Sequence, residues 1–124
     1  YKKVGNNTLD DCRKYNLDSK ELMGSDDPME LGKLIHKWNV EQFSGKEIIA
    51  IIFEGVHAIE GARKLAGATV PLLASPGTIR GDYTTVSAMS ENTNKKTIRN
   101  LVHTSGDEEE AEREINLWFE DSSN

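Results

Sequence analysis

His103 is the residue in this sequence whose type and position best fit chemistry. It ends the run Asn100-Leu101-Val102-His103, which has the composition of a short strand, and a helix N-terminus is expected directly after it. Backbone N–H groups and the helix dipole attract anions at such a point. An imidazole nitrogen can attack phosphorus and hold it as a phosphohistidine, which divides one transfer into two easier steps. A histidine that only caps or packs at a strand end fits the same run, so both interpretations stay open.

Residue types suited to holding an anion accompany this histidine. Arg63 and Thr69 flank the end of a predicted helix, and Arg80 stands in the turn sequence PGTIRGDY. A planar guanidinium offers phosphate two parallel charge-assisted hydrogen bonds. A surface turn with a structural Arg–Asp pair explains Arg80 about equally well, and Arg99 is a third candidate cation. Glu114, on the final predicted helix, could fold back to orient the imidazole ring or to tune its basicity.

The elements that must position these side chains follow from hydrophobic spacing and capping residues. Residues 47–53 are continuously apolar and β-branched after the first, as in a central strand covered on both faces. Asp27 before Pro28, with Glu30 three residues after the cap, predicts a helix over 28–40. The other expected elements are a helix over 8–15 capped by Thr8, a helix over 57–66 ended by Gly67, a functional loop or partly disordered segment over 68–96, a strand over 100–103, and a helix over 106–115 started by a Ser105/Glu108 capping box, with Trp118 and Phe119 folding back onto the core.

The length and composition of the sequence limit the kinds of protein that it can encode. The 124 residues suit one domain, and 15 basic against 21 acidic residues give a net charge of -6, which argues against general binding to nucleic acid. A few placed cations and a magnesium ion still permit a nucleotide site. Cys12 is the only cysteine, which suits a reducing cytosol. The longest apolar run, 48–53, is far below a membrane span, and no signal-peptide pattern opens the chain. We therefore expect a cytoplasmic protein without a membrane segment.

From residue 48 to residue 119, the order of motifs resembles the nucleoside diphosphate kinase family. An apolar strand ends in Glu54-Gly55, a helix follows, and then come GATVP, PGTIRGDY, NLVHTSG and EEAEREINLWF in family order. Several independent motifs must coincide to give this order, which makes the signature a strong one. The sequence departs from the family at Thr104, where Gly is usual, and at Gly106, where Asp is usual. Residues 84–99 form a polar insertion that, like residues 1–43, resembles the longer forms of archaea and some bacteria.

The resemblance implies an enzyme that moves the terminal phosphate of a nucleoside triphosphate, with ATP as donor, to a nucleoside diphosphate. The exchange would be ping-pong, through a phosphohistidine at His103. The residues that the resemblance assigns are Glu114 and Ser105 beside His103, Arg63, Thr69 and Arg80 on the nucleotide phosphates, and Asn100 on the sugar. It also implies Mg²⁺ on the β- and γ-phosphates, although the sequence shows no magnesium motif. For the full-length protein it implies a homo-oligomer, either a tetramer or a hexamer.

The resemblance further implies an α+β fold, a ferredoxin-like antiparallel sheet with helices packed on it. The family opens with a strand bearing Ile-Lys-Pro-Asp, a helix and a second strand, none of which is present here. Residues 1–124 are therefore expected to form a single, N-terminally truncated domain, poorly folded and inactive alone. The alternative function is a non-catalytic relative, or an inactive fragment, that binds nucleotide or a protein partner, although a pseudoenzyme has little reason to keep the whole set of site residues. An acidic interaction domain explains none of the motif order.

Overall fold

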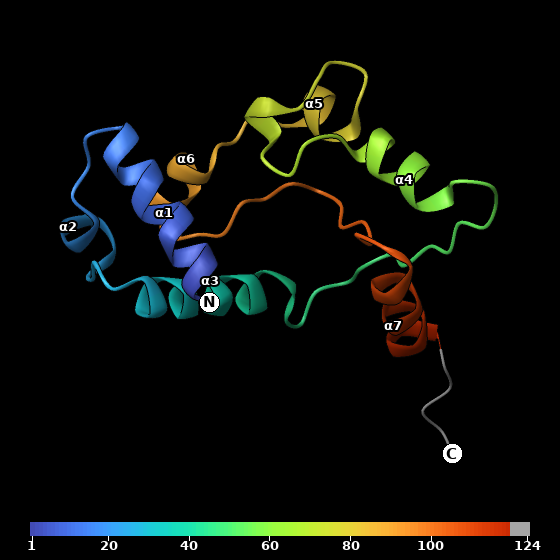
Figure 1. The fold of residues 1–124 in the computed structure, drawn as a ribbon, viewed down its shortest axis with the longest axis horizontal. Helices are drawn as coiled ribbons and strands as arrows, with labels where there is room; N and C mark the ends of the chain where they lie inside the picture. Colours follow the sequence, from blue (N-terminus) through green and yellow to red (C-terminus); the bar gives the residue numbers. More distant parts are fainter. Residues whose placement is uncertain (120–124) are drawn as a thin grey trace. The chain divides into compact units, whose positions relative to one another are not determined.

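The computed structural model describes residues 1–119, and this part of the chain consists of helices joined by segments without regular structure (Figure 1). The helices are α1 (Lys2–Lys14), α2 (Ser19–Met23), α3 (Pro28–Phe43), α4 (Ala58–Ala66), the 3-10 helix η1 (Pro71–Leu73), α5 (Ile79–Tyr83), α6 (Ala88–Thr93) and α7 (Glu108–Phe119). They form two compact units. Unit 1 comprises residues 1–47 and 86–99, and unit 2, over the residues described, comprises 48–85 and 100–119. The expectation of a single domain stays a prediction.

The predicted α+β fold with a ferredoxin-like antiparallel sheet is wrong for this structure, because residues 1–119 contain no β-strand. Residues 47–53 and 100–103, the two expected strands, have no regular secondary structure, and no backbone hydrogen bond joins 47–53 to another described segment. A strand exists only where a second strand satisfies its N–H and C=O groups. Apolar β-branched residues favour a strand through packing against such neighbours. Without one in the described chain, Ile49 stays 90% exposed.

Unit 1 is built on the packing of α1 against α3. Cys12 of α1 and Leu31 and Trp38 of α3 are buried there. The two helices approach closely at Gly5, where an added Cβ would lie 1.8 Å from the carbonyl oxygen of Pro28. This contact explains why α1 begins at Lys2 and not at the predicted Thr8, since burial of a helix face outweighs a weak capping signal.

The capping signals at α3 and α4 are confirmed. Asp27 accepts hydrogen bonds from the backbone N–H groups of Met29 and Glu30, both at 2.9 Å, and Pro28 takes the first helical position. At the C-terminal end of α4, Gly67 terminates the helix as predicted, and its φ is +88°. Short-range hydrogen bonding decides these boundaries, which is why the sequence alone predicts them.

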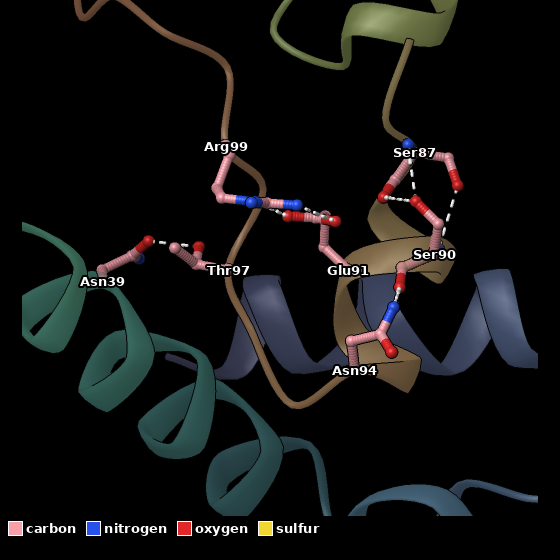
Figure 2. Close-up of polar contacts among 7 residues, drawn as sticks. All are labelled: Asn39, Ser87, Ser90, Glu91, Asn94, Thr97 and Arg99. Atoms are coloured by element: carbon pink, nitrogen blue, oxygen red, sulfur yellow. Dashed lines mark hydrogen bonds and ion pairs between the residues drawn. The ribbon is translucent and has the colours of Figure 1, made fainter. Parts of the chain in front are cut away.

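The polar segment 68–96 holds more structure than the predicted loop, because η1, α5 and α6 all lie within it. Figure 2 shows how α6 is fixed within unit 1: the Glu91 carboxylate accepts from Arg99 Nε at 2.5 Å and from Nη2 at 3.2 Å, and the Thr97 hydroxyl donates to Asn39 of α3. The hydrogen bond to Glu91 and that residue's charge raise the pKa of Arg99. Arg99 is therefore an ion-pair partner in unit 1.

Two predictions about the C-terminal helix are wrong. Asp107 accepts from the N–H of Glu110 at 2.8 Å and caps α7, while the Ser105 hydroxyl bonds elsewhere, so no Ser105/Glu108 capping box forms. Trp118 is 56% exposed, and Phe119 is also exposed, so neither folds back onto a core. Unit 2 offers little to pack against, since Ala66 and Pro71 are the only buried apolar residues among those described in it.

Candidate functional site

His103, Glu114 and Ser105 form a hydrogen-bonded group in unit 2. His103 Nε2 lies 2.7 Å from Glu114 Oε1, and the Ser105 hydroxyl donates to Glu114 Oε2 at 2.8 Å. Glu114 lies on α7, and this helix places its carboxylate beside the segment that contains His103 and Ser105. With Nε2 donating its proton to the carboxylate, the lone pair of the ring lies on Nδ1. No described residue bonds to Nδ1, and the His103 side chain is 63% exposed, so this nitrogen is open to a reactant.

Glu114 stays ionised beside the histidine. Partial burial acts to raise its pKa, but hydrogen bonds from His103 and Ser105, together with the charges of His103 and Arg113, outweigh that effect and lower the pKa overall. A carboxyl group with a lowered pKa in the folded protein contributes stability above its unfolded pKa, and loses it as the pH falls through the lowered value. The group is therefore intact at neutral pH.

We predict that replacing Ser105 with Ala raises the pKa of Glu114, because one of the two hydrogen bonds that favour the carboxylate is lost. Carboxyl ¹³C chemical shifts, followed from neutral to acidic pH, measure this directly. In the unchanged protein, the pKa of Glu114 should lie below the ordinary value of a glutamate side chain. The same titration midpoint for Glu114 with and without the serine would contradict this hydrogen bond.

Arg80 is the most buried charged residue of the site, with 6% of its surface exposed. Its Nε donates to the carbonyl of Asn100 at 3.1 Å, Nη1 to that of Gly67 at 2.9 Å, and Nη2 to that of Val102 at 2.6 Å. The guanidinium therefore ties the segment before His103 to the end of α4. Burial lowers the pKa of Arg80, and the nearby positive charge of Arg63 lowers it further. Arg63 and Arg80 are neighbouring positive charges with little negative charge near them, and such a pair favours the binding of an anion beside it.

The remaining predicted residues lie next to this arginine. Asn100 donates through Nδ2 to the carbonyl of Thr69 at 3.0 Å, which links the two segments. Arg63 is exposed on α4, and its Nη1 lies 3.8 Å from the point where a Cβ on Gly106 would stand, in the loop that follows His103. The structure thus brings all seven predicted residues together within unit 2.

Two residues of this site were missed from the sequence. Glu110 Oε2 accepts from the N–H of Gly106 at 2.5 Å, and Arg113 Nη2 lies 3.7 Å from Glu110 Oε1 and 3.9 Å from Glu114 Oε1. Glu110 precedes Glu114 by four positions on a predicted helix, and this spacing places both on one face. His103, Glu110 and Glu114 each offer one ligand atom, all within 4.8 Å of one another, so they are the described residues that could hold a metal ion, with Arg113 competing for the same carboxylates.

Comparisons with known proteins agree on one family. A family model described as nucleoside diphosphate kinase matches residues 18–123. This chain belongs to the nucleoside diphosphate kinase family. The nucleoside diphosphate kinase of Pyrobaculum aerophilum is 38% identical over 116 residues, which cover 94% of this chain and 63% of that protein. The nucleoside diphosphate kinase of Borreliella burgdorferi is 44% identical over 87 residues, which cover 68% of this chain and 52% of that protein.

Solved structures of nucleoside diphosphate kinases resemble the chain as well. The crystal structure of the Pyrobaculum aerophilum enzyme superposes with a TM-score of 0.89 at 36% identity, covering 95% of this chain and 65% of that one. A Borrelia burgdorferi structure, described as a transition state mimic with bound vanadate and ADP, gives a TM-score of 0.52 at 51% identity, covering 54% and 40%. The chain spans less than two thirds of the length of these kinases. No helix among residues 1–119 is long and apolar enough to cross a membrane.

Proposed function

We propose that this chain carries the phosphate-accepting site of a nucleoside diphosphate kinase. The site moves the terminal phosphate of a nucleoside triphosphate, with ATP as donor, to a nucleoside diphosphate by ping-pong exchange through His103. The observation that carries the proposal is the pairing of His103 Nε2 with the Glu114 carboxylate at 2.7 Å, which leaves Nδ1 as the free nucleophile. Family membership supplies the reaction class. The alternative, a non-catalytic relative, has no observation in its favour.

In the first half-reaction, the Nδ1 lone pair attacks the γ-phosphorus. The new N–P bond forms as the bond from phosphorus to the bridging oxygen breaks, and the nucleoside diphosphate leaves with that electron pair. The ring becomes positive, and the Glu114 carboxylate next to Nε2 stabilises this charge. In the second half-reaction, a terminal oxygen of another nucleoside diphosphate attacks the same phosphorus and the neutral imidazole is restored. One histidine therefore serves both nucleotides in turn.

The nucleotide would be held by the cations and amides around His103. Arg63, Thr69 and Arg80 contact the phosphates in this proposal, and Asn100 contacts the sugar. A guanidinium has five N–H groups, and Arg80 uses three of them on carbonyls, so two are left for phosphate oxygens. The ADP and vanadate in the Borrelia burgdorferi structure support a site of this kind.

Mg²⁺ belongs to the same proposal. When bound, it offsets negative charge on the β- and γ-phosphates. It prefers oxygen ligands, and Oε1 of Glu110 would suit it, because no described group donates a hydrogen bond to this oxygen and Arg113 Nη2 is 3.7 Å away, whereas both oxygens of Glu114 are engaged by His103 and Ser105. The assembly into a tetramer or hexamer remains a proposal that rests on the family, and the cytoplasmic location remains one that rests on the single cysteine.

Labelling of the protein by [γ-³²P]ATP, with no acceptor nucleotide added, tests the proposed function. A ping-pong enzyme takes the labelled phosphate onto the protein and releases ADP, and GDP added to the isolated labelled protein then removes the label as GTP. Direct transfer between two bound nucleotides would instead leave the protein unlabelled and make transfer depend on both nucleotides being present together. The second outcome would overturn the role of His103 as a carrier.

A further inference from the structure

Glu110 of α7 holds the loop that joins His103 to this helix. Its Oε2 accepts from the backbone N–H of Gly106 at 2.5 Å, and its own N–H donates to the Asp107 carboxylate, which caps α7. In the usual capping box, the carboxylate three residues after the cap bonds to the N–H of the capping residue itself. Here the carboxylate reaches one residue further back. The bond therefore fixes a residue of the loop as well as the first turn of the helix.

Gly106 leaves room for this bond because it has no side chain. A Cβ at Gly106 would stand 2.8 Å from Glu110 Oε2, too close for two atoms that are not bonded, whereas Arg63 Nη1 at 3.8 Å would be in ordinary contact. The φ of Gly106 is not positive, so its backbone conformation is open to alanine. Gly106→Ala would therefore act through Glu110, by displacing the carboxylate from the N–H.

The loop fixed in this way carries the groups that orient the histidine. Ser105, directly before Gly106, donates to Glu114 Oε2 at 2.8 Å, and Glu114 Oε1 lies 2.7 Å from His103 Nε2. A movement of Gly106 would shift Ser105, and the hold of Ser105 on the carboxylate that pairs with the ring would weaken. Misplacement of a reacting group by about 1 Å can slow a reaction by about 10²-fold.

The other contact of the Glu110 carboxylate cannot fix the loop. Arg113 Nη2 lies 3.7 Å from Oε1, too far for a hydrogen bond, and its side chain is exposed. An exposed ion pair of this kind contributes little. The bond from Gly106 to Oε2 is therefore the one through which Glu110 acts on the loop.

We propose that Glu110 is a positioning residue for phosphoryl transfer through His103. It holds the loop 104–106, and through Ser105 and Glu114 it keeps the ring in place while the charge of the ring changes. This role rests on the proposed function, and it is distinct from a contact of Oε1 with Mg²⁺ because it uses Oε2. A carboxylate that only capped α7 would stabilise the fold and leave the rate of transfer unchanged.

A double-mutant cycle tests this coupling. The rate constant for phosphorylation of His103 is measured in single turnovers at saturating ATP and Mg²⁺. Gly106→Ala should slow this step about threefold to tenfold and Glu110→Ala about tenfold, with little change in the ATP concentration that gives half the maximal rate. Both changes break the same bond, so the double variant should be no slower than Glu110→Ala alone. Losses that multiply in the double variant would overturn the proposal.

Glu110→Gln and Glu112→Ala are the matched variants. Glutamine keeps an oxygen that can accept from Gly106, so the rate should return to within about threefold of that of the unchanged protein. Glu112 is exposed on the same helix, and its replacement by alanine removes an equal charge and should leave the rate unchanged. Failure of glutamine to rescue the rate, or equal slowing in Glu112→Ala, would indicate an effect of charge and contradict the positioning role.

Amide hydrogen exchange at Gly106 separates this inference from the proposed function, because it needs no nucleotide. The N–H of Gly106 should exchange about tenfold faster in Glu110→Ala than in the unchanged protein. An unchanged exchange rate would overturn the inference even if His103 takes up phosphate. Faster exchange without slower transfer would reduce Glu110 to a helix cap and also overturn it. Absence of label on the unchanged protein would overturn the proposed function, and the role of Glu110 in transfer would fall with it.

Discussion

His103→Gln is expected to abolish the phosphoenzyme and to slow phosphate exchange between nucleotides by about 10⁴-fold or more. The glutamine side chain has a similar reach, but its amide is no nucleophile of comparable strength. In the unchanged protein, incubation with labelled ATP should give a phosphoenzyme that is acid-labile and base-stable, as a phosphoramidate is. The pairing of Nε2 with Glu114 leaves a single ring nitrogen for this bond. Loss of the ring should therefore remove all of the label.

His36→Gln is the matched control for this variant. His36 lies on α3 in unit 1, where its ring packs edge-on against Tyr1 with centroids 5.3 Å apart, whereas the residues of the site belong to unit 2. The label should form normally in this variant. Label that persists in His103→Gln, or that disappears equally in His36→Gln, would contradict the assignment of the carrier.

Arg80→Ala is expected to slow transfer by about 10²–10³-fold, with a local loss of order that the sequence alone does not predict. The family resemblance in the sequence assigns Arg80 only to the nucleotide phosphates. In the structure it also holds the carbonyls of Gly67, Asn100 and Val102. A buried carbonyl that loses its donor costs roughly 1–3 kcal/mol. The segment that carries His103 should therefore loosen as the cation is lost.

Two comparisons separate positioning from charge. Arg63→Ala removes an exposed cation with no such carbonyl contacts, so it should slow transfer without raising amide hydrogen exchange in residues 100–103. Arg80→Lys keeps the charge but has one nitrogen in place of three, so it cannot span the three carbonyls. It should behave like Arg80→Ala in hydrogen exchange. Full rescue by lysine would contradict the positioning role.

The parts of the molecule that the sequence predicts well are those decided by short-range contacts. Asp27 and Pro28 start α3 and Gly67 ends α4 because caps act over three or four residues. The site residues were found because their motifs stand in family order, and the structure joins Asn100 to Thr69 and Glu114 to His103 by hydrogen bonds.

The parts that could not be predicted depend on distant partners. Residues 47–53 have the composition of a strand, but a strand needs a neighbour, and none of the described residues supplies one. Helix α6 was missed because its buried Glu91 is satisfied by Arg99, eight positions later, in a segment that is mostly polar. Trp118 was expected to fold back onto the core but is exposed, because an aromatic residue is buried only where other apolar residues are present to cover it.

The most direct test of the central claim is to find which nitrogen of His103 carries the phosphoryl group. Phosphoenzyme prepared with ATP from protein with ¹⁵N-labelled histidine can be examined by ³¹P–¹⁵N correlation under mildly alkaline conditions, where phosphohistidine is stable. Because Glu114 engages Nε2, phosphorus should be bonded to Nδ1 of His103 alone. Phosphorus on Nε2, or on any other residue, would contradict it.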